Sequence, residues 1–247
     1  MRWEDSGIFL SGRPHGETSV IADIFTREHG RTLGLVKGGR SKRIRPMLQT
    51  GNGLSVEWRA RLEDQLGVYT VELVKATAAR VLDDHLALLG ITAVASLLQV
   101  LPERDPHPKL FDAVEFCLTQ ADMKRFVECI IRFELRLLDE LGFGLDLTHC
   151  AATGRKDELI FVSPKSGQAV SREAGEPYRA KLLALPAFLK DEATADAAEH
   201  GEIADGLNLT GYFLGVHVFG GGEASLPLAR QQFATAIYRL NRQSTHN

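Results

Sequence analysis

The sequence of 247 residues predicts an α+β protein, with a five-stranded β-barrel in residues 1–80 and a mainly α-helical domain in residues 81–247. Two observations predict this division. Apolar residues alternate with a period of two in the first 80 residues, as in strands, and recur with a period near 3.6 from Leu82, as in helices. The charge changes at the same place: residues 1–80 carry 13 Lys and Arg against 9 Asp and Glu, and the remainder carries 16 against 23.

Five short strands are expected in the first domain, each followed by a turn or a polar loop. Five strands in a compact unit suit the small closed barrel of the OB-fold. In the fourth strand, alternation places Trp58 on the core face and Arg59 and Arg61 on the outer face. This favours a core role for Trp58 over the alternative, a platform on which bases stack. The expected strands are Ile8–Ser11, Ser19–Thr26, Thr32–Lys37, Leu54–Leu62 and Gly67–Val74.

Helical spacing marks five segments of the second domain, namely 83–101, 109–119, 122–141, 204–219 and 227–242. A β-hairpin interrupts them in an insert at about residues 146–178, with strands Leu159–Val162 and Gln168–Ser171 joined by a Ser-Pro-Lys-Ser-Gly turn. The insert resembles a zinc ribbon, but only His149 and Cys150 could act as ligands nearby, whereas a structural zinc site needs four. We therefore expect no metal or cofactor.

Composition excludes several classes of protein. The charged fraction of 25% and the hydrophobic fraction of 44% are typical of soluble globular proteins. The acidic start argues against a signal peptide, and no apolar run reaches the roughly 20 residues that span a bilayer. Three cysteines without close pairing suit a reducing compartment. We expect a cytoplasmic protein without a membrane partner.

No catalytic residues are predicted. The chain contains no GxSxG, GxxxxGK[ST], HExxH or CxxC motif. The run Asp83-Asp84-His85 opens an expected helix, where acidic residues cap the backbone and complement the helix dipole. The adjacent pair His149-Cys150 is interpreted as structural, because neighbouring residues seldom face each other productively.

A basic stretch in the first domain is the strongest candidate for a binding site, because residues 31–45 contain six cations and no acidic residue. Cations on a loop between barrel strands can follow a phosphodiester backbone and bind it independently of sequence. The alternative is a solvated loop without a partner. The candidate DNA-binding residues are these six and the two outward arginines of the fourth strand: Arg31, Lys37, Arg40, Lys42, Arg43, Arg45, Arg59 and Arg61.

A second candidate lies on the helix expected at residues 122–141. Arg125, Arg132 and Arg136 fall within about 20° of one direction at 100° per residue. Arginines on one helical line could hold an acidic peptide or a terminal carboxylate. The alternative is surface ion pairing, since Glu128 precedes Arg132 in the favourable i,i+4 order.

Three stretches resemble the RecO family of recombination mediators. GIFLSGRPHGETSVIADIFTREHGRTLGLVKGGRSKR is similar to the family's opening strand, its R-x-x-G-E and F-T-x-x-H-G turns and its V-K-G-x-R ending. RFELRLLDELGFGLDLTHCAATG and SPKSGQAVSREAG resemble its central helix and its zinc-ribbon-like hairpin. The resemblance covers essentially the whole chain. It implies an OB-fold that binds single- and double-stranded DNA, annealing of complementary strands, and loading of RecA onto SSB-coated DNA together with RecR.

The resemblance also guides two expectations about sites. Zinc-binding members carry two C-x-x-C pairs, whereas this chain has Cys-Ala-Ala-Thr at 150–153 and Ser-Arg-Glu-Ala at 171–174, so the insert is expected to fold without zinc. The family binds the acidic C-terminal tail of SSB through the helical domain. The match places Arg132 there, and Arg125 and Arg136 join it because they share its helical face, with Arg230 as a weaker candidate. We expect Arg132 on the solvent side of its helix.

Two other functions stay open at this point. A metal-dependent nuclease or other nucleic-acid-processing enzyme would need a carboxylate cluster for Mg²⁺, and no such cluster is visible in the sequence. A basic RNA-binding module would be distinguished by competition between RNA and DNA. We favour the mediator, which would be a nucleoid-associated protein of the cytoplasm.

Overall fold

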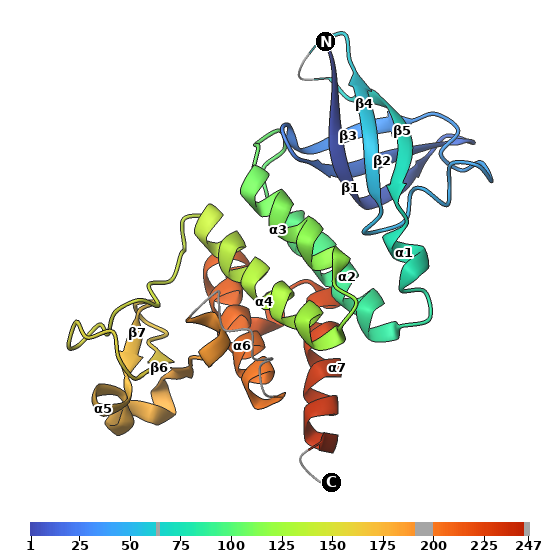
Figure 1. Ribbon diagram of the computed structural model, residues 1–247. Helices are drawn as coiled ribbons and strands as arrows, with labels where there is room; N and C mark the ends of the chain where they lie inside the picture. The colour runs from blue at the N-terminus through green and yellow to red at the C-terminus, as the bar shows by residue number, and fades with distance from the viewer. Residues whose placement is uncertain (63–64, 191–199, 245–247) are drawn as a thin grey trace. The chain divides into compact units, whose positions relative to one another are not determined.

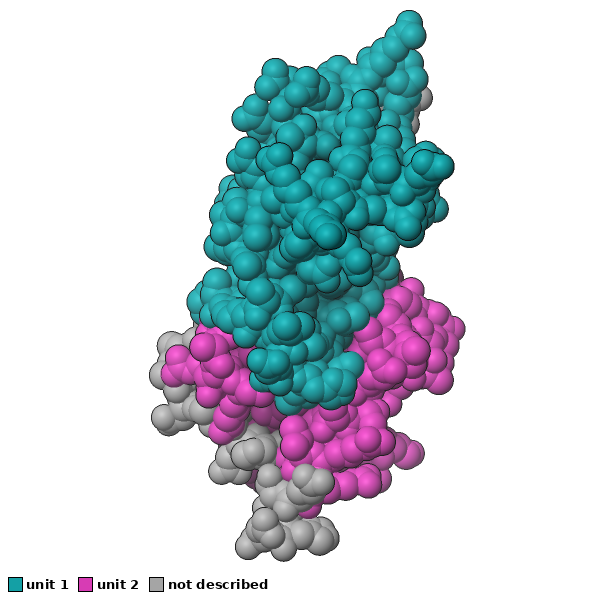
Figure 2. All heavy atoms as spheres, turned by 90° about the vertical axis from the view of Figure 1, so that its right-hand side faces the viewer, with its two compact units in different colours: residues 1–119 teal, residues 120–247 magenta. Residues whose placement is uncertain are grey.

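The computed structural model describes residues 1–62, 65–190 and 200–244. Contacts within the chain divide it into two compact units, Met1–Thr119 and Gln120–Asn247 (Figures 1 and 2). The first unit therefore holds two long helices as well as the strands. The domain boundary expected at residue 80 stays a prediction. No helix in the described ranges is long and apolar enough to cross a membrane.

Five strands of the first unit form a closed barrel, in the order β1-β2-β3-β5-β4 (Figure 1). All neighbouring strands are antiparallel except β3 and β5, which are parallel. The predicted fold class, an α+β chain opening with a five-stranded barrel, is confirmed. The strands are β1 Arg2–His15, β2 Ser19–Thr26, β3 Gly30–Val36, β4 Gly53–Arg59 and β5 Gly67–Lys75.

The first strand is longer than the four residues expected. Its first half pairs with β4 and its second half with β2, and a bulge between Phe9 and Ser11 bends it from one neighbour to the other. The expectation was wrong because Arg2, Glu4 and Ser6 are exposed and polar, which hides the strand from a search for apolar residues.

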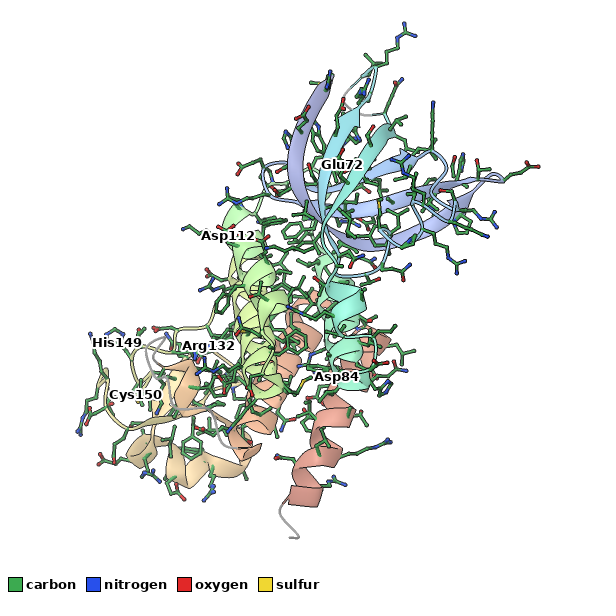
Figure 3. All side chains as sticks on the ribbon, turned by 45° about the vertical axis from the view of Figure 1, so that its right-hand side comes forward. Glu72, Asp84, Asp112, Arg132, His149 and Cys150 are labelled. Carbon is green, nitrogen blue, oxygen red and sulfur yellow. The ribbon has the colours of Figure 1, made fainter. Side chains whose placement is uncertain are left out.

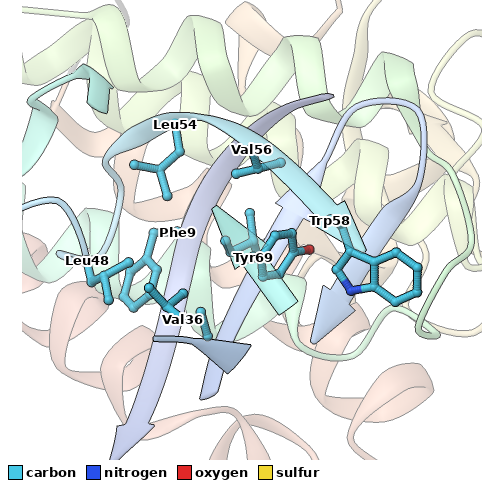
Figure 4. Close-up of a cluster of buried hydrophobic side chains, with 9 residues drawn as sticks. Phe9, Val36, Leu48, Leu54, Val56, Trp58 and Tyr69 are labelled. Carbon is cyan, nitrogen blue, oxygen red and sulfur yellow. The ribbon is translucent and has the colours of Figure 1, made fainter. Parts of the chain in front are cut away.

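Large side chains fill the barrel from all five strands (Figure 4). Trp58 is only 2% exposed and donates its indole N–H to the Leu33 carbonyl at 3.3 Å, so its predicted place in the core is confirmed. Gly34 faces the ring of Tyr69 so closely that a Cβ atom would collide with it. A larger residue at position 34 would therefore push Tyr69 out of the core.

Two helices pack against the barrel within the first unit. The first, α2 (His85–Leu98), follows the single turn α1 (Thr77–Arg80), and the second is α3 (Pro108–Thr119). The side chain of Asp84 accepts the N–H of Ala87 at 3.0 Å, which confirms that this acidic run caps a helix. Phe25 of β2 packs against Phe111 of α3, with ring centroids 5.7 Å apart.

The second unit is built on α4 (Met123–Glu140), α6 (His200–Phe213) and α7 (Leu228–Ser244). Asp122 caps α4 by accepting the N–H of Arg125 at 2.9 Å. Phe126, Ile130 and Phe133 form the buried stripe that the helical spacing predicted. A π-helical turn, η3 (Leu214–Val218), extends α6.

The predicted hairpin is present as β6 (Leu159–Val162) and β7 (Ala169–Ser171), with β8 (Leu183–Ala184) as a third strand. Two short helical turns, α5 (Arg172–Gly175) and η1 (Glu176–Lys181), lead to β8, and η2 (Ala187–Leu189) follows it.

Cys150 anchors this insert from the loop before β6 (Figure 3). Its buried Sγ accepts the N–H of Ser171 at 3.2 Å and contacts the Ser171 hydroxyl at 3.4 Å. Burial acts to raise the pKa of the Cys150 thiol, but hydrogen bonds, first of all the one with Ser171, lower it to about 6. Cys150 and Ser171, which the resemblance matched to ligand positions of a zinc ribbon, thus meet here through a hydrogen bond. Among the residues that the structure describes, no three His, Cys, Asp or Glu are grouped to hold a metal ion.

Candidate nucleic-acid interface

The basic loop, residues 37–45, begins the connection between β3 and β4. Its five cations, Lys37, Arg40, Lys42, Arg43 and Arg45, are exposed. Among the residues that the structure describes, none of these five side chains forms an ion pair. Because no carboxylate neutralises them, they present a concentrated positive charge to an anionic ligand.

Apolar residues anchor the basic loop to the barrel. Leu48 belongs to the barrel core, and Ile44 and Met47 pack against that core from a partly buried position. Within the loop, the N–H of Arg45 donates to the Ser41 carbonyl at 2.9 Å, which closes a turn. The cations thus project from an ordered segment, so the chain loses less conformational entropy when they bind than a flexible loop would lose.

Asn52, which is not among the residues predicted from the sequence, holds the end of this connection. The residue is 2% exposed, and its amide nitrogen donates to the carbonyls of Pro46 and Met47, each at 3.1 Å. Its amide oxygen accepts the N–H of Ala78 at 3.0 Å. The sequence feature that could have identified Asn52 is its place between Gly51 and Gly53, in a segment that must turn sharply into β4.

The structure corrects the expectation for Arg31, the first of the candidate DNA-binding residues. Its side chain is 16% exposed, pairs with Asp23 at 3.0 Å and donates to the Leu101 carbonyl at 3.1 Å. Burial raises the pKa of Asp23, and the Arg31 charge opposes this shift. Arg31 therefore stabilises a buried carboxylate in its own unit and is not available to a phosphate.

The two outward arginines of β4 and its following loop are exposed, as the alternation predicted. Arg59 pairs with Glu57 at 2.5 Å, and Arg2 pairs with the same carboxylate at 2.6 Å. Glu57 therefore offsets part of the positive charge of this face. Arg61 lies beyond the end of β4.

In the second unit, Arg125 and Arg136 of α4 are exposed. Arg132, which lies on the same helix (Figure 3), is half-buried. Its guanidinium donates to the Phe188 carbonyl at 2.6 Å and lies over the Phe188 ring, 5.6 Å from the centroid. The expectation that Arg132 lies on the solvent side of its helix was wrong, because the segment that holds Phe188 packs onto that face.

Arg230 is the third arginine whose expected position the structure corrects. Only 1% of it is exposed, and both Nε and Nη2 donate to the buried carboxylate of Glu134. The carbonyl of Leu207 and the hydroxyl of Thr210 complete its partners, at 3.0 and 3.4 Å. With its donors used inside the unit, Arg230 cannot reach a peptide on the surface. Its partner was visible in the sequence as a lone acid within the apolar stripe of α4.

Comparison with known proteins gives a consistent result. The family model described as Recombination protein O N terminal matches residues 1–77, and the one described as Recombination protein O C terminal matches residues 82–227. The chain is 50% identical over 241 residues to the DNA repair protein RecO of Methylorubrum populi, covering 94% of this chain and 97% of that protein. It is 48% identical over 238 residues to the DNA repair protein RecO of Mesorhizobium japonicum, covering 96% and 94%. It is 46% identical over 240 residues to the DNA repair protein RecO of Brucella abortus, covering 97% of each.

Proposed function

Since the chain belongs to the RecO family of DNA repair proteins, we propose that it is a recombination mediator that binds DNA directly. It binds single and double strands, anneals complementary single strands, and helps to load RecA onto SSB-coated DNA together with RecR. The observation that carries the proposal is the basic loop, whose five exposed cations stand on an anchored segment of the barrel.

The physical basis of annealing is phosphate neutralisation. Two complementary strands repel each other, and a protein that replaces their counterions with its own cations lowers that repulsion. Such binding is independent of sequence, as annealing of any two complementary strands requires. The residues that act in this step are Lys37, Arg40, Lys42, Arg43 and Arg45, with Arg59 and Arg61 as peripheral contacts.

Strand annealing tests this function against the nuclease alternative. The protein should anneal complementary strands in the presence of a chelator and without nucleotide, and it should leave the strands intact when Mg²⁺ is added. Degradation that depends on Mg²⁺ would favour a nuclease instead. If RNA of the same sequence competes far better than DNA, the protein is an RNA-binding module.

We further propose that α4 contributes to binding the SSB C-terminal tail. Arg125, Arg132 and Arg136 share one side of α4, and Arg132 is held in place by Phe188. A guanidinium that is already oriented loses little conformational entropy when it pairs with a carboxylate. The proposal also includes RecR as a partner and association of the protein with the nucleoid.

The three arginines on one side of α4 lead to a prediction about the affinity for the SSB-tail peptide. Arg132→Glu removes an attraction and adds a repulsion, so binding of a labelled SSB-tail peptide should fall by at least about tenfold, which is about 1.4 kcal/mol. The same change loses the contacts with Phe188, so thermal unfolding must be measured alongside. Arg136→Glu is the companion variant, because its side chain is exposed. If both variants bind the peptide as tightly as wild type, the tail binds elsewhere.

A further inference from the structure

A stack of aromatic rings lies at one end of the barrel. The ring of Trp3, on β1, is parallel to the imidazole of His29 within 7°, with centroids 4.1 Å apart. It is also parallel to the buried Trp58 of β4 within 13°, at 5.4 Å. Trp3 is half-buried, and the His29 side chain is 36% exposed, so part of the stack meets solvent.

A hollow of about 440 Å³ opens beside this stack, within the first unit. Trp3, His29 and Trp58 line it, together with Thr32 and the guanidinium-bearing residues Arg2 and Arg104. One carboxylate, that of Glu28, also lines the hollow, and it pairs with Arg27 at 2.7 Å. This volume lies in the range of about 300–1,000 Å³ that is usual for small-ligand sites. The lining combines aromatic surface with cations, which suits a ligand that is flat, polar and attached to a negative charge.

A contact with Asp5 fixes the orientation of the His29 ring. Its Nδ1 lies 2.9 Å from a carboxylate oxygen of Asp5, whose side chain is 4% exposed. The N–H of Glu28 donates to the same oxygen at 2.8 Å, so the turn between β2 and β3 is held as well. The imidazole therefore offers a fixed plane to a ligand.

Arg104 is brought to the hollow by an unusual backbone conformation. Its φ angle is +63°, a left-handed value that costs energy for a residue other than glycine. Its N–H donates to the Arg31 carbonyl at 2.8 Å, and its guanidinium donates to the Gln65 carbonyl at 3.1 Å while lying 5.8 Å from the centre of the Trp58 ring. These contacts hold a cation at the mouth of the hollow.

We propose that this hollow binds one unpaired base of single-stranded DNA, stacked against the exposed part of the Trp3–His29 pair. The adjoining phosphates lie near Arg2 and Arg104. An unpaired base offers the ring faces that such a stack needs, whereas bases in a duplex are already stacked on each other. The inference rests on the proposed DNA binding and assigns it a contact that discriminates between single and double strands.

The aromatic hollow and the basic loop lie at opposite ends of β3. His29 immediately precedes this strand, and Lys37 immediately follows it. Seven residues of strand span roughly 20 Å. A single strand that runs along β3 can therefore contact the basic loop with its phosphates and place a base in the hollow at the other end.

Intrinsic fluorescence tests the proposal directly, because Trp3 and Trp58 are the only tryptophans of the chain. Oligodeoxythymidylate should quench the emission, and an abasic oligonucleotide of equal length should quench it far less. The Trp3→Phe protein, in which the buried Trp58 is the remaining tryptophan, should lose most of the quenching. Equal responses to the two oligonucleotides would overturn the base contact.

A variant of the stack gives a second, independent measurement. His29→Ala should weaken binding of oligodeoxythymidylate about five- to tenfold, as expected for loss of one stacked base, and leave binding of the abasic oligonucleotide unchanged. Equal effects on both would overturn the proposal. Failure of the proposed function looks different: then neither oligonucleotide binds in a salt-dependent way to the wild-type protein.

Discussion

Replacing Arg230 by methionine is expected to lower the free energy of unfolding by about 3–5 kcal/mol. The methionine removes the cation that Glu134 faces and leaves the carboxylate buried, 0% exposed, with the Thr210 hydroxyl as its remaining partner. An uncompensated charge in a packed interior is among the costliest single defects in a folded protein. Urea denaturation followed by circular dichroism measures the loss.

The matched control is the double variant Arg230→Met with Glu134→Leu, which removes both charges. Replacing a buried ion pair by apolar residues of similar volume is often close to neutral, so the double variant should recover most of the lost stability. If Arg230→Met is as stable as wild type, the pair is not buried in solution and Arg230 returns as a candidate for the SSB tail.

The second large effect is expected from the basic loop. Replacing Lys42, Arg43 and Arg45 by alanine should reduce the slope of log affinity against log salt by about 2, from about 0.7 for each phosphate contact on single strands. At about 0.1 M salt this corresponds to a loss of affinity on the order of a hundredfold. Fluorescence anisotropy of labelled oligonucleotides at several salt concentrations measures both quantities.

The control for this variant removes the same charge elsewhere. Lys156, Lys165 and Arg172 are exposed cations of the hairpin insert, and their replacement by alanine also lowers the net charge by three. This control should keep nearly the wild-type slope, because its cations lie outside the barrel. If the two triple variants lose affinity equally, only net charge matters and the DNA does not follow the basic loop.

The sequence predicted those elements whose apolar pattern is regular. Four of the five strands, the buried stripe of α4 and the core place of Trp58 follow from alternation or helical spacing, because burial acts on whole faces of an element. The first half of β1 was not predicted, because it pairs through its backbone while its side chains are polar. Backbone pairing does not affect the spacing of apolar residues, so that spacing cannot reveal it.

The individual arginines were harder to place than the elements. A guanidinium occurs both on surfaces and in buried ion pairs, and the sequence does not show which distant acid pairs with which arginine. Asp23 gave no such signal for Arg31, and Glu134, although visible as an acid within the apolar stripe of α4, could not be assigned to Arg230. Arg132 was misplaced for a related reason, since the segment that covers it follows more than 50 residues later. The five cations of the basic loop are exposed, in a stretch that contains no acidic residue, and their role in binding DNA stays a prediction.

The most direct test of the account is annealing of complementary strands that are coated with SSB, measured by fluorescence energy transfer with a chelator present and nucleotide absent. The wild-type protein should anneal these strands. It should fail to anneal strands that are coated with SSB lacking its C-terminal tail. The Lys42, Arg43 and Arg45 triple variant should fail even on bare strands. Annealing that is unaffected by the triple change would contradict the central claim that the basic loop of the barrel brings the strands together.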